Sequence, residues 1–241
     1  MAKTPLLLVP GLLCSPRLYA PQVAALADRA DIVVPDWRRA PLAIWNNWED
    51  AGRWVLDQAP AEKFALTGLS LGGILAAEIM KQAPGRVSRL ALLDTVMTAQ
   101  TEAEQAVRRG RIRMAEQGQF EIVLGLQMAR FIPAYRLPDK ALVDEVVAMC
   151  REIGVEIYKR QEALAAVRPD RRPDLPGIEC PTIVVCGRDD AATPLALSQE
   201  IAAAIPGSEL VVIEQCGHLI TMERPDETNA ILRRWLASVR P

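Results

Sequence analysis

Short apolar runs alternate along this chain with longer stretches in which apolar residues recur at helical spacing. The apolar runs are bounded by Gly, Pro or Asp and cover residues 6–9, 32–34, 64–67, 87–93, 182–186 and 210–213. The helical stretches between them cover residues 18–28, 47–58, 71–82, 194–205 and 226–238. Nearly continuous apolar runs predict strands that are covered on both faces, as in a parallel sheet flanked by helices. The alternation therefore predicts an α/β protein with a doubly wound, mostly parallel sheet.

One long segment interrupts this alternation. Residues 98–174 contain no convincing strand, and their apolar residues recur only at helical spacing. The helices predicted there are 102–116, 120–131, 139–153 and 156–167. The stretch 168–176 is rich in Pro, Arg and Asp and is interpreted as the hinge that returns the chain to the sheet. We therefore predict a core made of 1–97 and 175–241 and a helical insertion at 98–174.

Composition excludes several functional classes. Half of the residues are apolar and 24% are charged, which favours a sizeable core over disorder. A formal net charge of -2 gives no excess of Lys and Arg that would bind the phosphates of a nucleic acid. Pro10-Gly11 interrupts the N-terminal apolar run, Leu13 is too large for a signal-peptide cleavage site, and no run approaches the ~20 apolar residues that span a bilayer. We expect a soluble, cytoplasmic protein with no nucleic-acid or membrane partner. The sequence does not indicate the oligomeric state.

Cysteine and histidine usage argues against a metal site. The five cysteines are an odd number with no C-x-x-C pair, which predicts buried thiols rather than a disulfide framework or a zinc site. His218 is the single histidine, so a metal would need carboxylates and thiols alone. We predict neither a metal nor a cofactor.

A Gly-x-Ser-x-Gly motif at residues 68–72 provides the candidate nucleophile. It joins the strand predicted at 64–67 to the helix predicted at 71–82, so Ser70 occupies a tight turn. Such a turn holds the serine in a strained conformation with its hydroxyl exposed, and the flanking glycines allow two backbones to approach. The alternative is a turn in which Ser70 only caps the helix. The strand and the helix on either side favour the catalytic interpretation.

His218 lies in a Cys-Gly-His loop between the strand predicted at 210–213 and the last helix. A lone histidine is more often structural than catalytic, but open α/β sheets build their sites at the carboxyl ends of strands. Imidazole also has a pKa suited to proton transfer near neutral pH. We therefore predict that His218 is the general base.

Asp189 and Asp190 are adjacent candidates for the acid that orients the imidazole. Both follow the strand predicted at 182–186, so either is expected to reach His218. The acid must accept a hydrogen bond from the imidazole and stabilise its protonated form, which either carboxylate can do. Either aspartate also lies between Ser70 and His218 in the sequence, so both choices give the same order of candidate residues along the chain: Ser, Asp, His.

Together these motifs resemble the α/β-hydrolase fold family, and in particular its small bacterial carboxylesterases. The resemblance covers nearly the whole length of the chain. The motifs on which it rests are residues 9–11, 68–72, 187–194, 216–218 and 223–225. It implies that the insertion is a cap that follows the sixth strand of the family fold. The loop that begins at Gly187 resembles the family's Gly-x-x-Asp-x-x-x-Pro pattern, which selects Asp190 and leaves Asp189 as a loop residue or salt-bridge partner.

An oxyanion hole is expected from two backbone amides. The expected pair is Leu71 and a residue just after the first strand, which we assign to Leu12. Many members of the family carry His-Gly at this turn, where this chain has Pro10-Gly11, and the difference leaves the Leu12 amide in place.

The substrate cleft is expected between the cap and the sheet. The predicted apolar walls are Met97, Phe120, Met128, Phe131 and Tyr158. Polar side chains that could grip a carboxylate are Arg130, Arg136, Gln161 and Arg168, although arginines on helical caps are usually solvated. An apolar pocket with few polar groups favours uncharged esters with short or medium acyl chains.

The expected activity is hydrolysis of small, mainly uncharged carboxylic esters through an acyl-enzyme. One alternative is a lactonase or carbon–carbon bond hydrolase acting on a metabolite carboxylate, and the cap arginines would then bind that carboxylate. Another alternative is a thioesterase. A ligand sensor on the same fold is an alternative of a different class, and it would bind a small molecule with little turnover.

Overall fold

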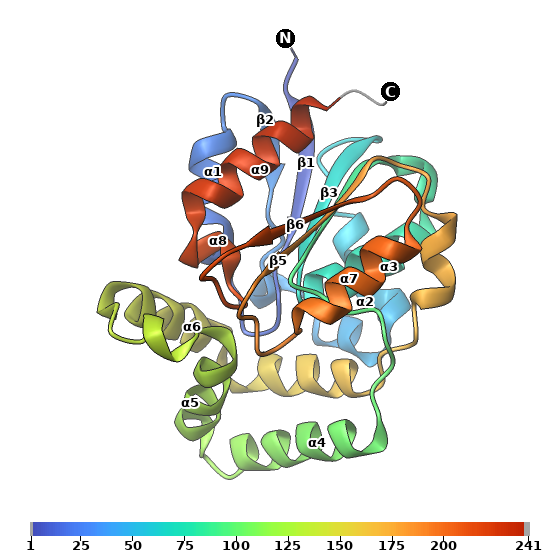
Figure 1. Cartoon of the computed structure of the whole chain (residues 1–241). Coiled ribbons are helices and arrows are strands. Elements are labelled where there is room, and N and C mark those ends of the chain that lie inside the picture. Colours follow the sequence, from blue (N-terminus) through green and yellow to red (C-terminus); the bar gives the residue numbers. More distant parts are fainter. Residues whose placement is uncertain (1, 239–241) are drawn as a thin grey trace.

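The computed structural model describes residues 2–238 and contains one sheet of six parallel strands flanked by helices (Figure 1). The strands are β1 (Thr4–Val9), β2 (Ala30–Val33), β3 (Phe64–Leu69), β4 (Val87–Leu93), β5 (Thr182–Gly187) and β6 (Glu209–Ile213). Their order across the sheet is β2-β1-β3-β4-β5-β6, and every neighbouring pair is parallel. The predicted α/β class and doubly wound sheet are confirmed.

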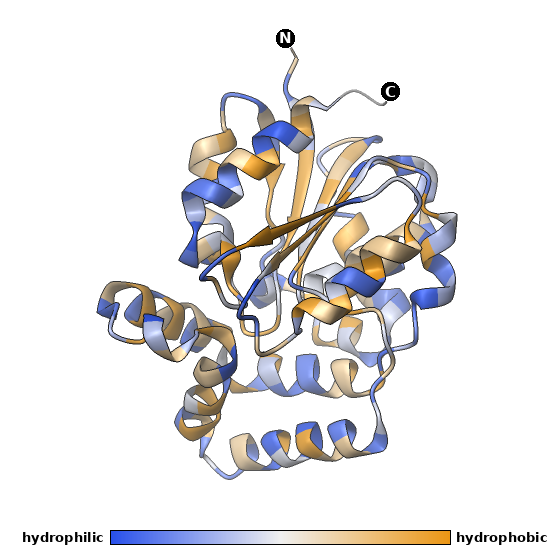
Figure 2. Cartoon of the chain, viewed as in Figure 1, coloured by the Kyte–Doolittle hydropathy of each residue, from blue (hydrophilic) through white to orange (hydrophobic). Residues whose placement is uncertain are grey.

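Helices cover both faces of this sheet. α1 (Ala20–Leu26) and α9 (Pro225–Ala237) pack on one face, whereas α2 (Trp48–Leu56), α3 (Leu71–Gln82) and α7 (Leu195–Ala204) lie on the other (Figure 1). The strands are coloured mostly hydrophobic, and the helices that cover them show both hydrophobic and hydrophilic colours (Figure 2). β3 and β5 are buried along their whole length because both of their faces are covered.

The insertion forms three helices beyond the carboxyl ends of the strands, namely α4 (Glu102–Glu116), α5 (Phe120–Phe131) and α6 (Lys140–Ala166) (Figure 1). We call them the cap helices. They follow β4, the fourth strand of this sheet, which stands where the family fold has its sixth. Gly154 has φ 74° and ψ 169° and interrupts α6, so the two helices expected on either side of it meet at this glycine.

Several short helical turns were not anticipated from the sequence. They include Trp37–Arg39, Leu42–Asn46 and α8 (Ile220–Glu223). Turns of three to five residues are too short to show a helical period. Among residues 2–238, no helix combines the length and the apolar character needed to cross a lipid bilayer.

The strand order creates a crevice between β1 and β3. The chain runs from β1 outward to β2 and then returns to β3 on the other side of β1. Ligands of open α/β sheets bind at such a reversal, outside the carboxyl ends of the strands. Leu12 follows β1 and Ser70 follows β3, so the fold places both at this crevice.

Candidate active site

Ser70 occupies a strained turn between β3 and α3. Its backbone has φ 55° and ψ -117°, a region that residues other than glycine rarely adopt. A side chain on Gly72 would overlap the Val9 carbonyl oxygen, and one on Gly68 would overlap the Gly72 backbone. The Thr95 hydroxyl donates to the Ser70 carbonyl oxygen at 2.7 Å. Close backbone packing therefore holds the serine in the conformation that the motif predicts.

His218 and Asp190 form a buried pair. Imidazole Nδ1 lies 2.8 Å from Asp190 Oδ2, and the two residues are 1% and 4% exposed. Asp190 also accepts hydrogen bonds from the amides of Ala192 (2.7 Å) and Thr193 (2.9 Å) and from the Thr193 hydroxyl (2.6 Å). Burial alone would raise the pKa of Asp190, but the facing imidazole and these hydrogen bonds lower it below its ordinary value. Asp190 is thus suited to hold Nδ1 protonated.

Asp189 lies outside this pair. Its exposed carboxylate accepts a 2.6 Å hydrogen bond from the hydroxyl of Tyr135, which follows the cap helix α5. Adjacent positions in the loop therefore have different surroundings, because one side chain turns toward the imidazole and the other toward the surface.

The cap contributes directly to the position of His218. The Phe131 ring stacks on the imidazole with centroids 5.5 Å apart, and the Phe131 carbonyl accepts from the His218 amide at 3.0 Å. Gly217 has no room for a side chain because the Pro133 ring and the Phe131 carbonyl occupy that space. These contacts were not predicted, since the sequence indicates no pairing between α5 and the loop after β6.

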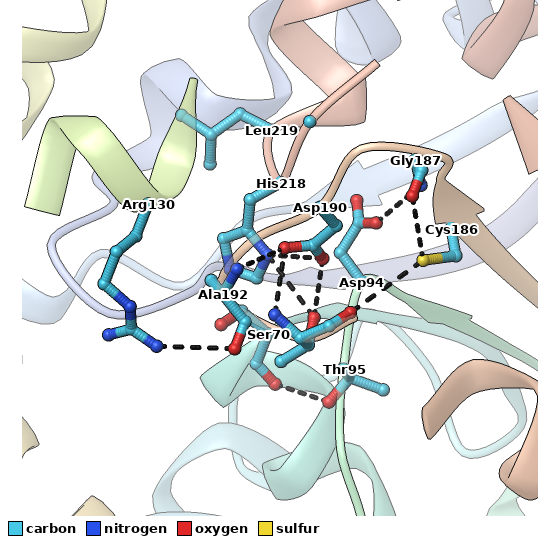
Figure 3. A network of polar contacts seen from close by, with 12 residues as sticks. Ser70, Asp94, Thr95, Arg130, Cys186, Gly187, Asp190, Ala192, His218 and Leu219 are labelled. Carbon is cyan, nitrogen blue, oxygen red and sulfur yellow. Dashed lines mark hydrogen bonds and ion pairs between the residues drawn. The ribbon is translucent and has the colours of Figure 1, made fainter. Parts of the chain in front are cut away.

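Ser70 and His218 line the same cavity and lie close together in Figure 3, although no hydrogen bond joins the serine hydroxyl to the imidazole in this conformation. Hydrogen bonds of this kind often form only when substrate is bound. Leu12 and Leu71 also line the cavity, and within residues 2–238 neither backbone amide has a hydrogen-bond acceptor. Both backbone amides are therefore free to donate to a ligand.

The turn that carries Leu12 is held by the cap. The Leu13 amide donates to Gln161 Oε1 at 3.0 Å, and Leu13 has a positive φ of 61°. Gln161 was one of the side chains considered for gripping a substrate carboxylate. It lies outside the cavity wall because its side chain is engaged with this turn.

The cavity has a volume of about 220 Å³ and lies between the sheet and the cap helices. Phe131 lines it, but the other four residues predicted for its apolar wall do not. Met97 and Met128 are buried in the core. Phe120 packs against the Tyr158 ring at 5.5 Å, and Tyr158 donates to Glu162 at 2.9 Å inside the cap. Met97 therefore packs in the core from the segment after β4, and the other three side chains pack within or beneath the cap helices instead.

Charged side chains line the cap side of the cavity. They are Glu104, Arg108, Arg130 and Arg168. Arg136, the remaining polar candidate, pairs instead with Asp139 at 3.1 Å. The wall therefore combines apolar side chains, among them Ile74, Val96 and Phe131, with three guanidinium groups. It is not the largely apolar pocket that would favour uncharged esters.

Asp94, directly after β4, is a buried carboxyl that was not considered among the site residues. Its Oδ1 accepts from the Gly187 amide at 2.9 Å, and its Oδ2 has no partner among the described residues. Asp94, Cys186 and Asp190 bring ligand atoms within 4.8 Å of one another. Burial raises the pKa of both the Asp94 carboxyl and the Cys186 thiol, which favours their protonated forms over metal ligation.

We expect Asp94→Asn to gain stability relative to the wild type as pH rises. A carboxyl whose folded-state pKa is raised stabilises the protein fully below its unfolded pKa and loses that contribution as pH rises toward the folded pKa. The difference should grow by up to about 1.4 kcal/mol per pH unit in this interval. Thermal unfolding of both proteins from pH 5 to 8 measures it, and a constant difference across this range would contradict a protonated Asp94.

A parallel sheet with a strained serine turn and a buried histidine–aspartate pair at its carboxyl edge defines the alpha/beta hydrolases. A sequence model of the alpha/beta hydrolase family matches residues 6–231, and the chain belongs to this family. The family and its named members support hydrolase activity on small molecules.

Among curated relatives, a provisionally named carbamate hydrolase, RutD, from Azorhizobium caulinodans is 28% identical over 96% of this chain and 90% of that protein. A provisionally named non-heme bromoperoxidase, BpoC, from Mycobacterium tuberculosis is 30% identical over 77% of this chain and 71% of its own length. Among solved structures, a malate-bound thermophilic esterase from Thermogutta terrifontis superposes with a TM-score of 0.86 at 25% identity, covering 98% of this chain and 90% of that chain.

Proposed function

We propose that this protein is a serine hydrolase that cleaves small carboxylic esters through an acyl-enzyme. The observation that carries the proposal is the cavity shared by Ser70 and His218, with Asp190 bonded to the far side of the imidazole. A strained serine, a neutral base and an orienting carboxylate are the groups that acyl transfer requires.

In the proposed mechanism, His218 Nε2 takes the proton of the Ser70 hydroxyl as Oγ attacks the ester carbonyl carbon. The amides of Leu12 and Leu71 donate to the oxyanion of the tetrahedral intermediate. Asp190 holds Nδ1 protonated and stabilises the imidazolium, which then protonates the departing alcohol. Water activated by His218 hydrolyses the acyl-enzyme and restores Ser70.

We propose that residues 98–174 form the cap and that residues 1–97 and 175–241 form the core. The cap would then cover the site at the edge of the core. Its contribution is supported by the Phe131 ring on the imidazole and by Gln161 at the turn that carries Leu12. The relatives named as an esterase and, provisionally, as a carbamate hydrolase support hydrolysis of a small molecule at a carbonyl group.

We expect a preference for short acyl chains. The cavity of about 220 Å³ is below the range of roughly 300–1,000 Å³ typical of pockets for drug-sized ligands. Initial rates with p-nitrophenyl acetate, butyrate, octanoate and palmitate should therefore fall steeply beyond butyrate. A fluorophosphonate should label the peptide that contains Ser70. Absence of both turnover and labelling would contradict the proposed function, and a large ligand-induced thermal shift without turnover would favour a sensor.

A further inference from the structure

Three arginines from different parts of the cap meet at the cavity. Arg108 comes from α4, Arg130 from α5, and Arg168 from the segment just after α6. The same cavity is also lined by Ser70 and His218. Any small molecule bound next to the serine therefore lies within a short distance of these guanidinium groups.

Arg108 is held by a buried carboxylate. It forms an ion pair with Glu162, which also accepts from Gln127 Nε2 at 3.0 Å and from Tyr158 at 2.9 Å. Arg111 lies 3.8 Å from the same carboxylate. The single negative charge of Glu162 is thus shared by Arg108 and Arg111, so it neutralises only one of their two positive charges.

Arg130 and Arg168 have only neutral hydrogen-bond acceptors among the described residues. Arg130 donates to the Ala192 carbonyl at 3.3 Å and to Gln127 Oε1 at 3.4 Å (Figure 3). The amide of the same Ala192 donates to Asp190, so Arg130 lies beside the loop that carries the proposed orienting carboxylate. Arg168 is 8% exposed and donates to the Thr98 carbonyl at 2.6 Å. Burial lowers the pKa of both, and repulsion from Arg108 lowers it further, to about 10 for Arg168. Glu104 attracts Arg168, and Glu162 and Asp190 attract Arg130, but among the described residues none of these carboxylates forms an ion pair with either guanidinium. Largely buried cations without an ion-pair partner are costly unless an anion neutralises them.

We propose that Arg130 and Arg168, with Arg108 beside them, form a subsite for one carboxylate group of the substrate. The preferred substrates are then small esters or lactones that carry a free carboxylate a few atoms from the scissile carbonyl. This inference rests on the proposed ester hydrolysis, because it places the carboxylate relative to the acyl group on Ser70.

The charges of the wall favour a carboxylate over a phosphate. Glu104 lines the same cavity, and its carboxylate accepts from the Thr101 amide at 2.8 Å, so it remains fixed there. A negative charge on the wall opposes a dianion more strongly than a singly charged carboxylate. Planar guanidinium groups also bind a carboxylate through paired hydrogen bonds.

A matched pair of esters tests the subsite directly. Monomethyl succinate and methyl succinamate have nearly the same size, and they differ in a carboxylate against a neutral amide at the remote end. We expect wild-type kcat/KM to be at least about tenfold higher for monomethyl succinate, because charge-assisted hydrogen bonds are the strong ones. Equal values, or a preference for methyl succinamate, would overturn the inference.

Substitution assigns the preference to these arginines. Arg130→Gln and Arg168→Gln should each lower the ratio of the two kcat/KM values by about fivefold or more, and the charge-retaining Arg130→Lys should lose less. Arg109→Gln is the matched control, because Arg109 lies on α4 outside the cavity wall and, within residues 2–238, its guanidinium donates only to Gln105. The control should leave both rates and their ratio unchanged. A ratio unchanged in both cavity variants would overturn the assignment.

A measurement without turnover separates this inference from the proposed function. In Ser70→Ala protein, succinamate should raise the Tm more than the neutral succinamide, and Arg130→Gln in that background should remove the difference. If wild-type protein hydrolyses no ester but succinamate still binds preferentially, the proposed function fails and the anion subsite stands. If esters are hydrolysed but succinamate and succinamide shift the Tm equally, the subsite fails. A larger shift with inorganic phosphate than with succinamate would also overturn a carboxylate subsite.

Discussion

Ser70→Ala should lower kcat for p-nitrophenyl butyrate by about 10⁴-fold to 10⁶-fold. The substitution removes the oxygen that forms the acyl-enzyme but leaves the amides of Leu12 and Leu71 and the cavity in place. The remaining rate should be that of water attacking an ester held next to two amide donors. Because the Ser70 carbonyl and amide keep their partners, Thr95 and Leu93, the fold should be retained.

Two further variants separate loss of chemistry from loss of structure. Ser70→Gly should be as inactive as Ser70→Ala but more stable, because glycine adopts a φ of 55° without the strain that a side chain incurs. Ser88→Ala, on an exposed position of β4, should leave kcat unchanged. Steady-state rates together with thermal unfolding measure both effects. If Ser70→Ala retains a substantial part of the wild-type rate on every ester, Ser70 is not the nucleophile.

Elements with several helical turns or a buried apolar run were predicted well from the sequence. Glu102–Glu116 and Phe120–Phe131 were predicted with the bounds that the structure shows, because their apolar spacing persists over at least three turns. The break at Gly154 was also placed correctly between two predicted helices. The short turns at Trp37–Arg39 and Leu42–Asn46 were missed because their conformation depends on the packing of Trp37 against Trp45 and Trp54 rather than on local periodicity.

The geometry of the site followed from the topology, whereas the cavity wall did not. Ser70, Asp190 and His218 each follow a parallel strand, so their loops meet at one edge of the sheet. On α5, Gln127, Arg130 and Phe131 are spaced by three and four residues and face the cavity together, while Met128 faces the core. Which face of a cap helix lines the cavity depends on how the cap docks, and helical spacing alone does not determine that.

The two adjacent aspartates should respond very differently to the same substitution. We expect Asp190→Asn to lower kcat by about 10⁴-fold, the loss typical of a catalytic carboxylate that fixes the histidine tautomer. We expect Asp189→Asn to change kcat by less than about threefold, since its carboxylate is exposed and accepts from the Tyr135 hydroxyl rather than from the imidazole. The comparison is controlled internally, because both changes are isosteric and lie in one loop.

The physical reason lies in the hydrogen bonds around Asp190. An asparagine can still accept from the Ala192 and Thr193 amides, which bond Oδ1 at 2.7 and 2.9 Å. Its amide nitrogen would then replace Oδ2 and face His218 Nδ1 as a donor. Nδ1 must then accept, so the imidazole proton moves to Nε2, where it blocks removal of the proton from the Ser70 hydroxyl. Initial rates of the two variants decide the assignment: comparable losses, or a larger loss for Asp189→Asn, would show that Asp190 does not orient the base.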